Sequence, residues 1–182
     1  SYGTQKAIGE LLVNDYSRKG FLDGRALRLP TVVVRPGRPN RAASTFASSM
    51  IREPLAGKEA ICPVAPETVM ALTSPRRVVA ALAHAHDLPG DAFGGSRSLQ
   101  LPGFSTSVGE MAEAVRRAAG EDAFAHIRWQ RDRAIEAIVS GWPRALASSR
   151  ADALGFERDS GIDEAVRFFV EDDLAEQRRI AG

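Results

Sequence analysis

The sequence predicts a mixed α/β fold, in which short apolar strands alternate with amphipathic helices. Apolar side chains recur at helical spacing in several segments, and short apolar runs separate those segments. Proline or glycine ends most of the runs. Alternation of this kind favours a sheet covered by helices. The 182 residues are enough for one sizeable core, or for one domain and part of another.

The first element expected is a helix that begins near Tyr2. Leu12 and Tyr16 lie one turn apart on it, and Gly20 is a plausible stop after two basic residues. A short strand follows over residues 26–29, closed by Pro30. Residues 31–34 either continue this strand past a break or form a second one.

The middle of the chain is expected to begin with a loop over residues 35–40, which are rich in proline, glycine and arginine. Ser74 is placed to cap a helix and Pro75 to occupy its first turn. The expected elements are a helix at 42–52 stopped by Pro54, a strand at 60–64, a helix at 76–85 and a strand at 98–101.

Three further helices are expected in the C-terminal part. Ser107 and Glu110 form a capping-box pattern that opens a helix running to Gly120. A short helix is expected at 133–139, and an amphipathic one at 161–174.

Composition gives no reason to expect nucleic acid or a membrane as partner. The formal net charge is +1, and no apolar run approaches the ~20 residues that span a bilayer. Cys62 is the only cysteine, which excludes an intrachain disulfide and a four-cysteine metal site. A cytoplasmic protein is expected. The start has neither a signal-peptide layout nor a methionine, so an internal segment is expected.

Tyr2 and Lys6 are the residues that point to chemistry. They are spaced i, i+4, so both side chains leave one helix face. A nearby ammonium stabilises a phenolate, which could take a proton from an alcohol while hydride leaves for a nicotinamide. The lysine could also donate to the ribose of that cofactor. The alternative is an ordinary surface pair.

Three segments, in order, carry a resemblance to the extended short-chain dehydrogenase/reductases, the NAD-dependent epimerase/dehydratase family. They are the helix start Ser1-Tyr2-Gly3-Thr4-Gln5-Lys6, the strand Leu27-Arg28-Leu29-Pro30-Thr31, and the C-terminal Ser148–Phe156 with Ile162–Val166. The resemblance implies the C-terminal part of a doubly wound, Rossmann-like α/β enzyme with a smaller α/β substrate domain.

The resemblance also implies roles. Tyr2 and Lys6 would be catalytic and would contact NAD, and Pro30 and Thr31 would contact the cofactor at the strand end. The strand stop at Pro30 is compatible with that contact. A homodimer is implied as well.

A domain division follows from the resemblance. Residues 1–30 would end the dinucleotide-binding domain, 31–75 would be a substrate-domain segment, 76–104 would return to the sheet, and 105–182 would form the substrate or C-terminal domain. The N-terminal Rossmann half, with its glycine-rich turn, would be absent. The chain alone is therefore expected to lack dehydrogenase activity.

Within the family, residues 29–57 are similar to members that oxidise a four-carbon sugar acid at the hydroxyl next to its carboxylate. Arg35 and Arg38 could bind that carboxylate through charge-assisted hydrogen bonds. Asn40 and Ser44 could bind sugar hydroxyls. Solvated loop arginines are the alternative.

Two other functions stay open. One is a nucleotide-sugar epimerase or dehydratase of the same superfamily, and the other is a non-catalytic sugar-binding or regulatory module with the same fold. No metal is expected, because His84 and His86 would face different sides of a helix.

Overall fold

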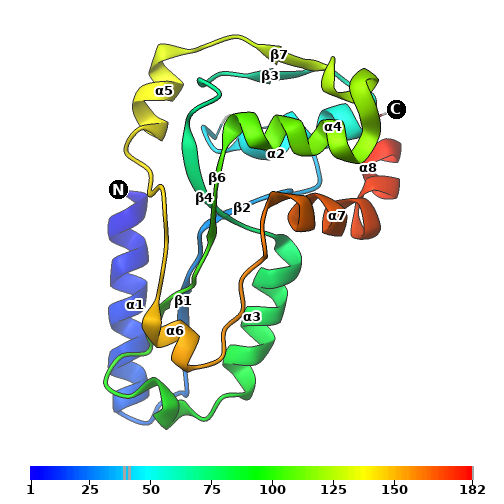
Figure 1. Ribbon diagram of the computed structural model, residues 1–182. Helices are drawn as coiled ribbons and strands as arrows, with labels where there is room; N and C mark the ends of the chain where they lie inside the picture. Colours follow the sequence, from blue (N-terminus) through cyan, green and yellow to red (C-terminus); the bar gives the residue numbers. More distant parts are fainter. Residues whose placement is uncertain (39, 41, 182) are drawn as a thin grey trace.

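The computed structural model describes residues 1–38, 40 and 42–181 (Figure 1). Pro39, in the predicted loop, lies outside this range. The helices are α1 (Tyr2–Arg18), α2 (Thr45–Leu55), α3 (Pro75–Asp87), α4 (Val108–Phe124), α5 (Arg133–Val139), α6 (Ser149–Ala153), α7 (Ile162–Asp172) and α8 (Leu174–Ala181), with a short 3-10 turn η1 (Gly90–Phe93). The strands are β1 (Ala26–Arg28), β2 (Thr31–Val32), β3 (Ala60–Cys62), β4 (Val69–Thr73), β5 (Ser98–Gln100), β6 (Phe104–Ser107) and β7 (Ile127–Trp129). The expected α/β class is confirmed.

A parallel pair of strands, β1 and β5, forms one end of the molecule. Leu27 lies opposite Leu99 in this pair, and α1 and α3 lie on either side of it in Figure 1. Helix α3 contributes Ala81 and Ala85 to the small core around Leu99. Parallel strands joined through a helix are typical of doubly wound sheets.

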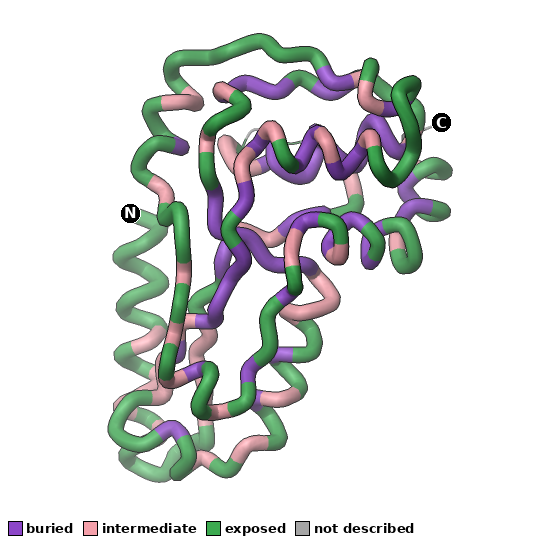
Figure 2. Tube along the Cα trace, viewed as in Figure 1, coloured by how far each residue is buried: buried purple, intermediate pink, exposed green. Residues whose placement is uncertain are grey.

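The larger core lies at the other end of the molecule, where Figure 2 shows most of the buried chain. Strand β4 pairs with β2 in parallel and with β6 antiparallel, and β3 pairs with β7. Helices α2, α4 and α7 pack together beside these strands. Every residue of α2 is buried, because the helix lies inside this core.

Two helix ends differ from the prediction. Pro54 does not stop α2 but lies within its last turn, where its missing N–H costs the helix one hydrogen bond close to its end. Helix α4 runs past Gly120, which interrupts it with a φ of 82°. Ala118 is exposed, so the buried face of α4 ends earlier than its apolar pattern suggests.

Other features of the prediction are present. Ser74 and Ser107 each accept a backbone hydrogen bond at the start of their helices. Gly20 follows the end of α1 with a φ of 75°. Of residues 31–34, only Thr31 and Val32 form a strand, β2, which lies in a different sheet from β1 and does not continue it.

A buried carboxylate joins the last third of the chain to the start of α3. Asp159 is 2% exposed and accepts hydrogen bonds from the backbone and hydroxyl of Ser74, at 2.9 and 2.6 Å. Thr73 also donates to it, at 3.3 Å. A buried carboxylate without hydrogen-bond partners would destabilise the fold. These bonds satisfy Asp159 and attach the segment before α7 to the sheet.

Helix α1 lies on the surface of the molecule, and none of its residues is buried. Its exposed apolar side chains are Tyr2, Ile8, Leu11, Leu12 and Tyr16. None of the described helices combines the length and the apolarity needed to cross a bilayer.

Candidate active site

Tyr2 and Lys6 lie in the first turns of α1, as their spacing predicts. The Lys6 ammonium is 5.3 Å from the centroid of the Tyr2 ring, a cation–π distance. Tyr2 is 74% exposed, so its hydroxyl is open to a reactant. The structure brings these two predicted residues together.

An ion pair missed by sequence reasoning anchors this helix to the sheet. Arg28, at the end of β1, donates two hydrogen bonds to Glu10 of α1, at 2.8 and 2.6 Å. These hydrogen bonds lower the pKa of the Glu10 carboxyl below its usual value. They connect Glu10, one turn beyond Lys6, with the strand that ends at Arg28, two residues before Pro30.

A second contact holds the other half of α1. The side chain of Asn14 accepts from the backbone N–H of Arg97 at 2.6 Å and donates to Ser98 at 3.3 Å. Both partners lie at the start of β5. Helix α1 is therefore positioned on the β1–β5 pair by polar contacts rather than by a packed apolar face.

Pro30 lies between β1 and β2, next to a close approach of two chain segments, and Thr31 is the first residue of β2. Pro30 is buried, and Thr31 is half-buried opposite Leu72 of β4. A Cβ at Gly103 would lie 2.8 Å from the Leu72 carbonyl oxygen and 3.0 Å from Pro30. Only glycine fits there, because a Cβ would overlap the backbone of β4, so the segment after β5 can pass close to Pro30.

Arg35 and Arg38 are both exposed, with Gly37 between them in an extended loop. The backbone around Arg35 is held by α2: its N–H donates to Ser48 at 3.1 Å, and its carbonyl accepts from Arg52 at 2.8 Å. Among the described residues, neither guanidinium group has a recorded hydrogen bond or ion pair, and both arginines are exposed to solvent.

Asn40 lines a cavity of about 570 Å³ beside α2, whereas Arg35, Arg38 and Ser44 do not. Its side-chain oxygen accepts from the N–H of Ala42 at 2.9 Å and from the hydroxyl of Thr45 at 2.5 Å. Its amide nitrogen is the group left to bind a hydroxyl. Of the four predicted substrate residues, only Asn40 reaches this cavity.

The same cavity contains an acid that the sequence did not single out. Glu53 lies at its wall, with a side chain 10% exposed, and accepts from Arg52 at 2.6 Å. Ser49, also in the wall, accepts from Arg52 at 3.0 Å. No spacing signal distinguishes Arg52 and Glu53 from a solvated pair, because only the tertiary fold buries them.

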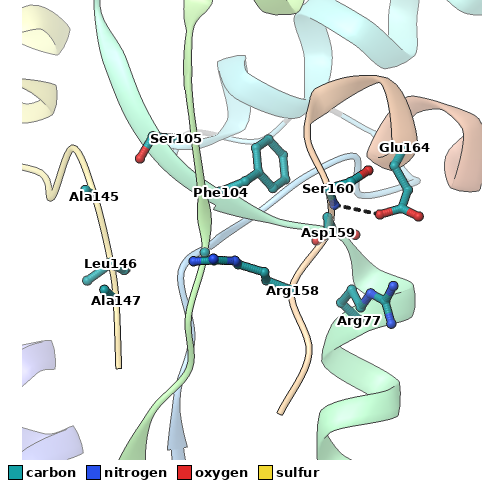
Figure 3. A pocket seen from close by; sticks show the side chains of 11 residues that line it. Arg77, Phe104, Ser105, Ala145, Leu146, Ala147, Arg158, Asp159, Ser160 and Glu164 are labelled. Atoms are coloured by element: carbon teal, nitrogen blue, oxygen red, sulfur yellow. Dashed lines mark hydrogen bonds between the residues drawn. The ribbon is translucent and has the colours of Figure 1, made fainter. Parts of the chain in front are cut away.

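A second cleft, of about 660 Å³, lies on another face (Figure 3). Residues 103–105, 145–147 and 158–160 form its walls, and the side chain of Arg158 extends across it. Its acids are already engaged, since Asp159 binds Ser74 and Glu164 accepts from the N–H of Ser160 at 2.7 Å. None of the predicted site residues lines this cleft.

The histidines of α3 do not meet. His84 lies 2.7 Å from the carbonyl oxygen of Leu154 and against the ring of Phe156, while His86 is exposed. Within the described part of the chain, no three acids, histidines or cysteines gather as metal ligands would.

Solved structures share this fold over almost the whole chain. The nucleoside-diphosphate-sugar epimerase from Agrobacterium tumefaciens matches with a TM-score of 0.91 and 45% identity, over 96% of this chain and 51% of that one. The L-threonine 3-dehydrogenase from Trypanosoma brucei matches with a TM-score of 0.78 at 24% identity, over 98% and 53% of the two chains, which supports the fold alone. No family model matches the chain. The chain therefore shares the Rossmann-like α/β fold of the NAD-dependent epimerases and dehydrogenases that it matches.

Two curated relatives carry the same name. The chain is 55% identical to D-erythronate dehydrogenase of Cupriavidus necator over 172 residues, and 47% identical to that of Haemophilus influenzae over 174. These matches cover 94% and 96% of this chain but 53% and 55% of the relatives. The chain thus spans about half the length of the curated relatives it matches.

Proposed function

We propose that the whole protein is an NAD-dependent oxidoreductase that takes a hydride from a secondary alcohol of a small, D-erythronate-like sugar acid. The observation that carries the proposal is the Tyr2–Lys6 pair, with Lys6 Nζ 5.3 Å from the Tyr2 ring. The pair lies on a helix anchored to β1, in a chain 55% identical to a D-erythronate dehydrogenase. Each feature alone is ambiguous, but together they favour this chemistry.

In this mechanism Tyr2 is the base and Lys6 its electrostatic partner. The Lys6 ammonium stabilises the phenolate of Tyr2, which takes the proton from the substrate hydroxyl. Lys6 has donors left for a ribose, so the exposed pair fits a dinucleotide as well as an alcohol. A bound nicotinamide would supply the hydride acceptor. Pro30 and Thr31, held at the strand end, would contact it.

The substrate carboxylate would bind to Arg35 and Arg38, and the hydroxyls to Asn40 and Ser44. Exposed guanidinium groups on a backbone fixed by Ser48 and Arg52 suit bidentate carboxylate binding. Lysine could not reproduce the planar two-bond geometry.

The whole protein would have the domain division expected from sequence, with residues 1–30 completing a dinucleotide-binding domain. The parallel pairing of β1 with β5 supports the return of residues 76–104 to that sheet. A segment outside this chain would supply the pyrophosphate site, so this chain alone is expected to be inactive. A cytoplasmic homodimer is part of the same proposal.

The test is turnover of the whole protein with NAD and a panel of four-carbon sugar acids. Tyr2→Phe removes the base, and we expect kcat to fall by about 100-fold or more. Lys6→Met should lower kcat and raise the KM for NAD. Tyr16→Phe is the matched control, since Tyr16 lies on the same helix and is half-exposed. Wild-type rates in Tyr2→Phe would overturn the mechanism.

A nucleotide-sugar epimerase is the second candidate. It is favoured by the epimerase title of a structure 45% identical to this chain, and by the roomy cavity beside α2. Epimerisation of a nucleotide sugar without net NAD reduction would establish it over the dehydrogenase. A non-catalytic sugar-binding module would bind the acid and turn over neither substrate.

A further inference from the structure

A cluster of buried polar side chains surrounds the loop that carries Arg35 and Arg38. Ser48 and Arg52 are 2% and 3% exposed on α2, and Gln177 is 1% exposed on α8. All three donate to or accept from the backbone of residues 35–37. Buried polar groups cost stability compared with apolar residues of the same size, so this grouping calls for a reason beyond packing.

Gln177 makes the most distant of these contacts. Its side-chain oxygen accepts the N–H of Gly37 at 2.8 Å, across 140 residues of sequence. Gly37 has a φ of 109°, which side-chain-bearing residues rarely adopt, and it separates the two exposed arginines. The bond therefore holds the turn that sets the direction of Arg35 relative to Arg38.

Helix α8 lies against α2, near the C-terminal end marked in Figure 1. Arg52 and Ser48 approach the loop from α2, and Gln177 approaches it from α8. The loop is thus held between two elements far apart in sequence, and its guanidinium groups remain in solvent. Preorganised binding groups of this kind lose less entropy when a ligand arrives.

We propose that Gln177 is a positioning residue for the sugar acid: its buried amide oxygen fixes the turn at Gly37 and so holds Arg35 and Arg38 in the arrangement that receives the carboxylate. This rests on the proposed function, in which Arg35, Arg38, Asn40 and Ser44 bind the substrate. Gln177 itself touches neither substrate nor cofactor.

The test compares Gln177→Leu, Gln177→Glu and Leu174→Ala in the whole protein. Gln177→Leu keeps the volume but removes the acceptor, and we expect the KM for the sugar acid to rise about 10-fold. The kcat and the KM for NAD should stay within about twofold of wild type. Gln177→Glu keeps an acceptor oxygen at the same reach and should restore most of the affinity.

Leu174→Ala is the structural control, because Leu174 is buried on the same helix and contacts the main core. It should lower the melting temperature while leaving the KM for the acid unchanged. An unchanged KM in Gln177→Leu, or an equal rise in Leu174→Ala, would overturn the proposal.

Hydrogen exchange separates failure of this inference from failure of the proposed function. Gln177→Leu should speed exchange at the Gly37 amide, whereas Leu174→Ala should not do so selectively. A wild-type protein without sugar-acid turnover would refute the proposed function, and the inference about the carboxylate with it. A Gly37 amide that stays protected in Gln177→Leu would refute the positioning role in either case.

Discussion

Cys62 shows how burial governs a single side chain. It is 0% exposed in the main core, and burial raises the pKa of its thiol to about 11. Desolvation disfavours the thiolate, so the folded protein holds the neutral form more tightly than the unfolded chain does.

The consequence is a loss of stability at high pH. Because the pKa of the Cys62 thiol is raised in the folded state, its contribution to folding stability is fully present below about pH 9. This contribution is lost as the pH rises toward 11. In the wild type we expect the free energy of unfolding to fall by up to about 3 kcal/mol over this window because of Cys62. In Cys62→Ala this part of the fall should be absent. Urea titrations of both proteins from pH 8 to 11 measure the difference, and parallel slopes would contradict it.

Arg52 and Glu53 form a buried ion pair on α2, and their side chains are 3% and 10% exposed. Removing one partner leaves an unpaired charge in a low-dielectric interior. We expect Glu53→Ala to lower the free energy of unfolding by about 3 kcal/mol or more. Denaturant unfolding provides the measurement.

The matched control for this pair is Glu59→Ala. Glu59 pairs with Arg128 at 2.6 Å, but both side chains are about 60% exposed. Solvent screening leaves such a pair worth less than about 1 kcal/mol. Equal losses in the two variants would mean that burial is not what matters at Glu53.

Two glycines in the interior of helices, Gly9 of α1 and Gly120 of α4, have opposite consequences for stability. A Cβ added at Gly9 would meet no atom from outside its own helix within 4 Å, whereas Gly120 interrupts α4 with a φ of 82°. Alanine favours the helical backbone but is strained at positive φ.

We therefore expect opposite signs from the same substitution. Gly9→Ala should raise the free energy of unfolding by about 0.5–1 kcal/mol, and Gly120→Ala should lower it by about 1 kcal/mol or more. Thermal melts of the two variants, compared with wild type, test the signs. A stabilising Gly120→Ala would show that the break in α4 is not required.

Across the whole molecule, the features predicted correctly from sequence are those that depend on residues close together in the chain. The serine caps of α3 and α4 were visible in the sequence, as was the i, i+4 pairing of Tyr2 with Lys6. Each depends on residues within one or two helical turns, so their spacing is sufficient to find them.

The rest depends on partners far away in sequence. Strands β4, β6 and β7 were not predicted. Strand β6 is largely polar, and β7 has three residues that pair with β3, 67 residues earlier in the chain. Neither the Glu10–Arg28 anchor nor the Gln177–Gly37 bond has a local pattern. Helices α6 and α8 are too short to show a clear apolar period.

The Asp159–Ser74 clasp has a kinetic consequence. Its two residues are 85 positions apart, so closing that loop costs chain entropy that local helices do not pay. We expect the contact to form after the rate-limiting step of folding. Asp159→Ala should then speed unfolding about 10-fold or more while changing the folding rate little, as stopped-flow chevrons would show. The Asp159–Ser74 contact would slow unfolding of the finished fold and so lengthen its lifetime, without affecting how fast the fold forms.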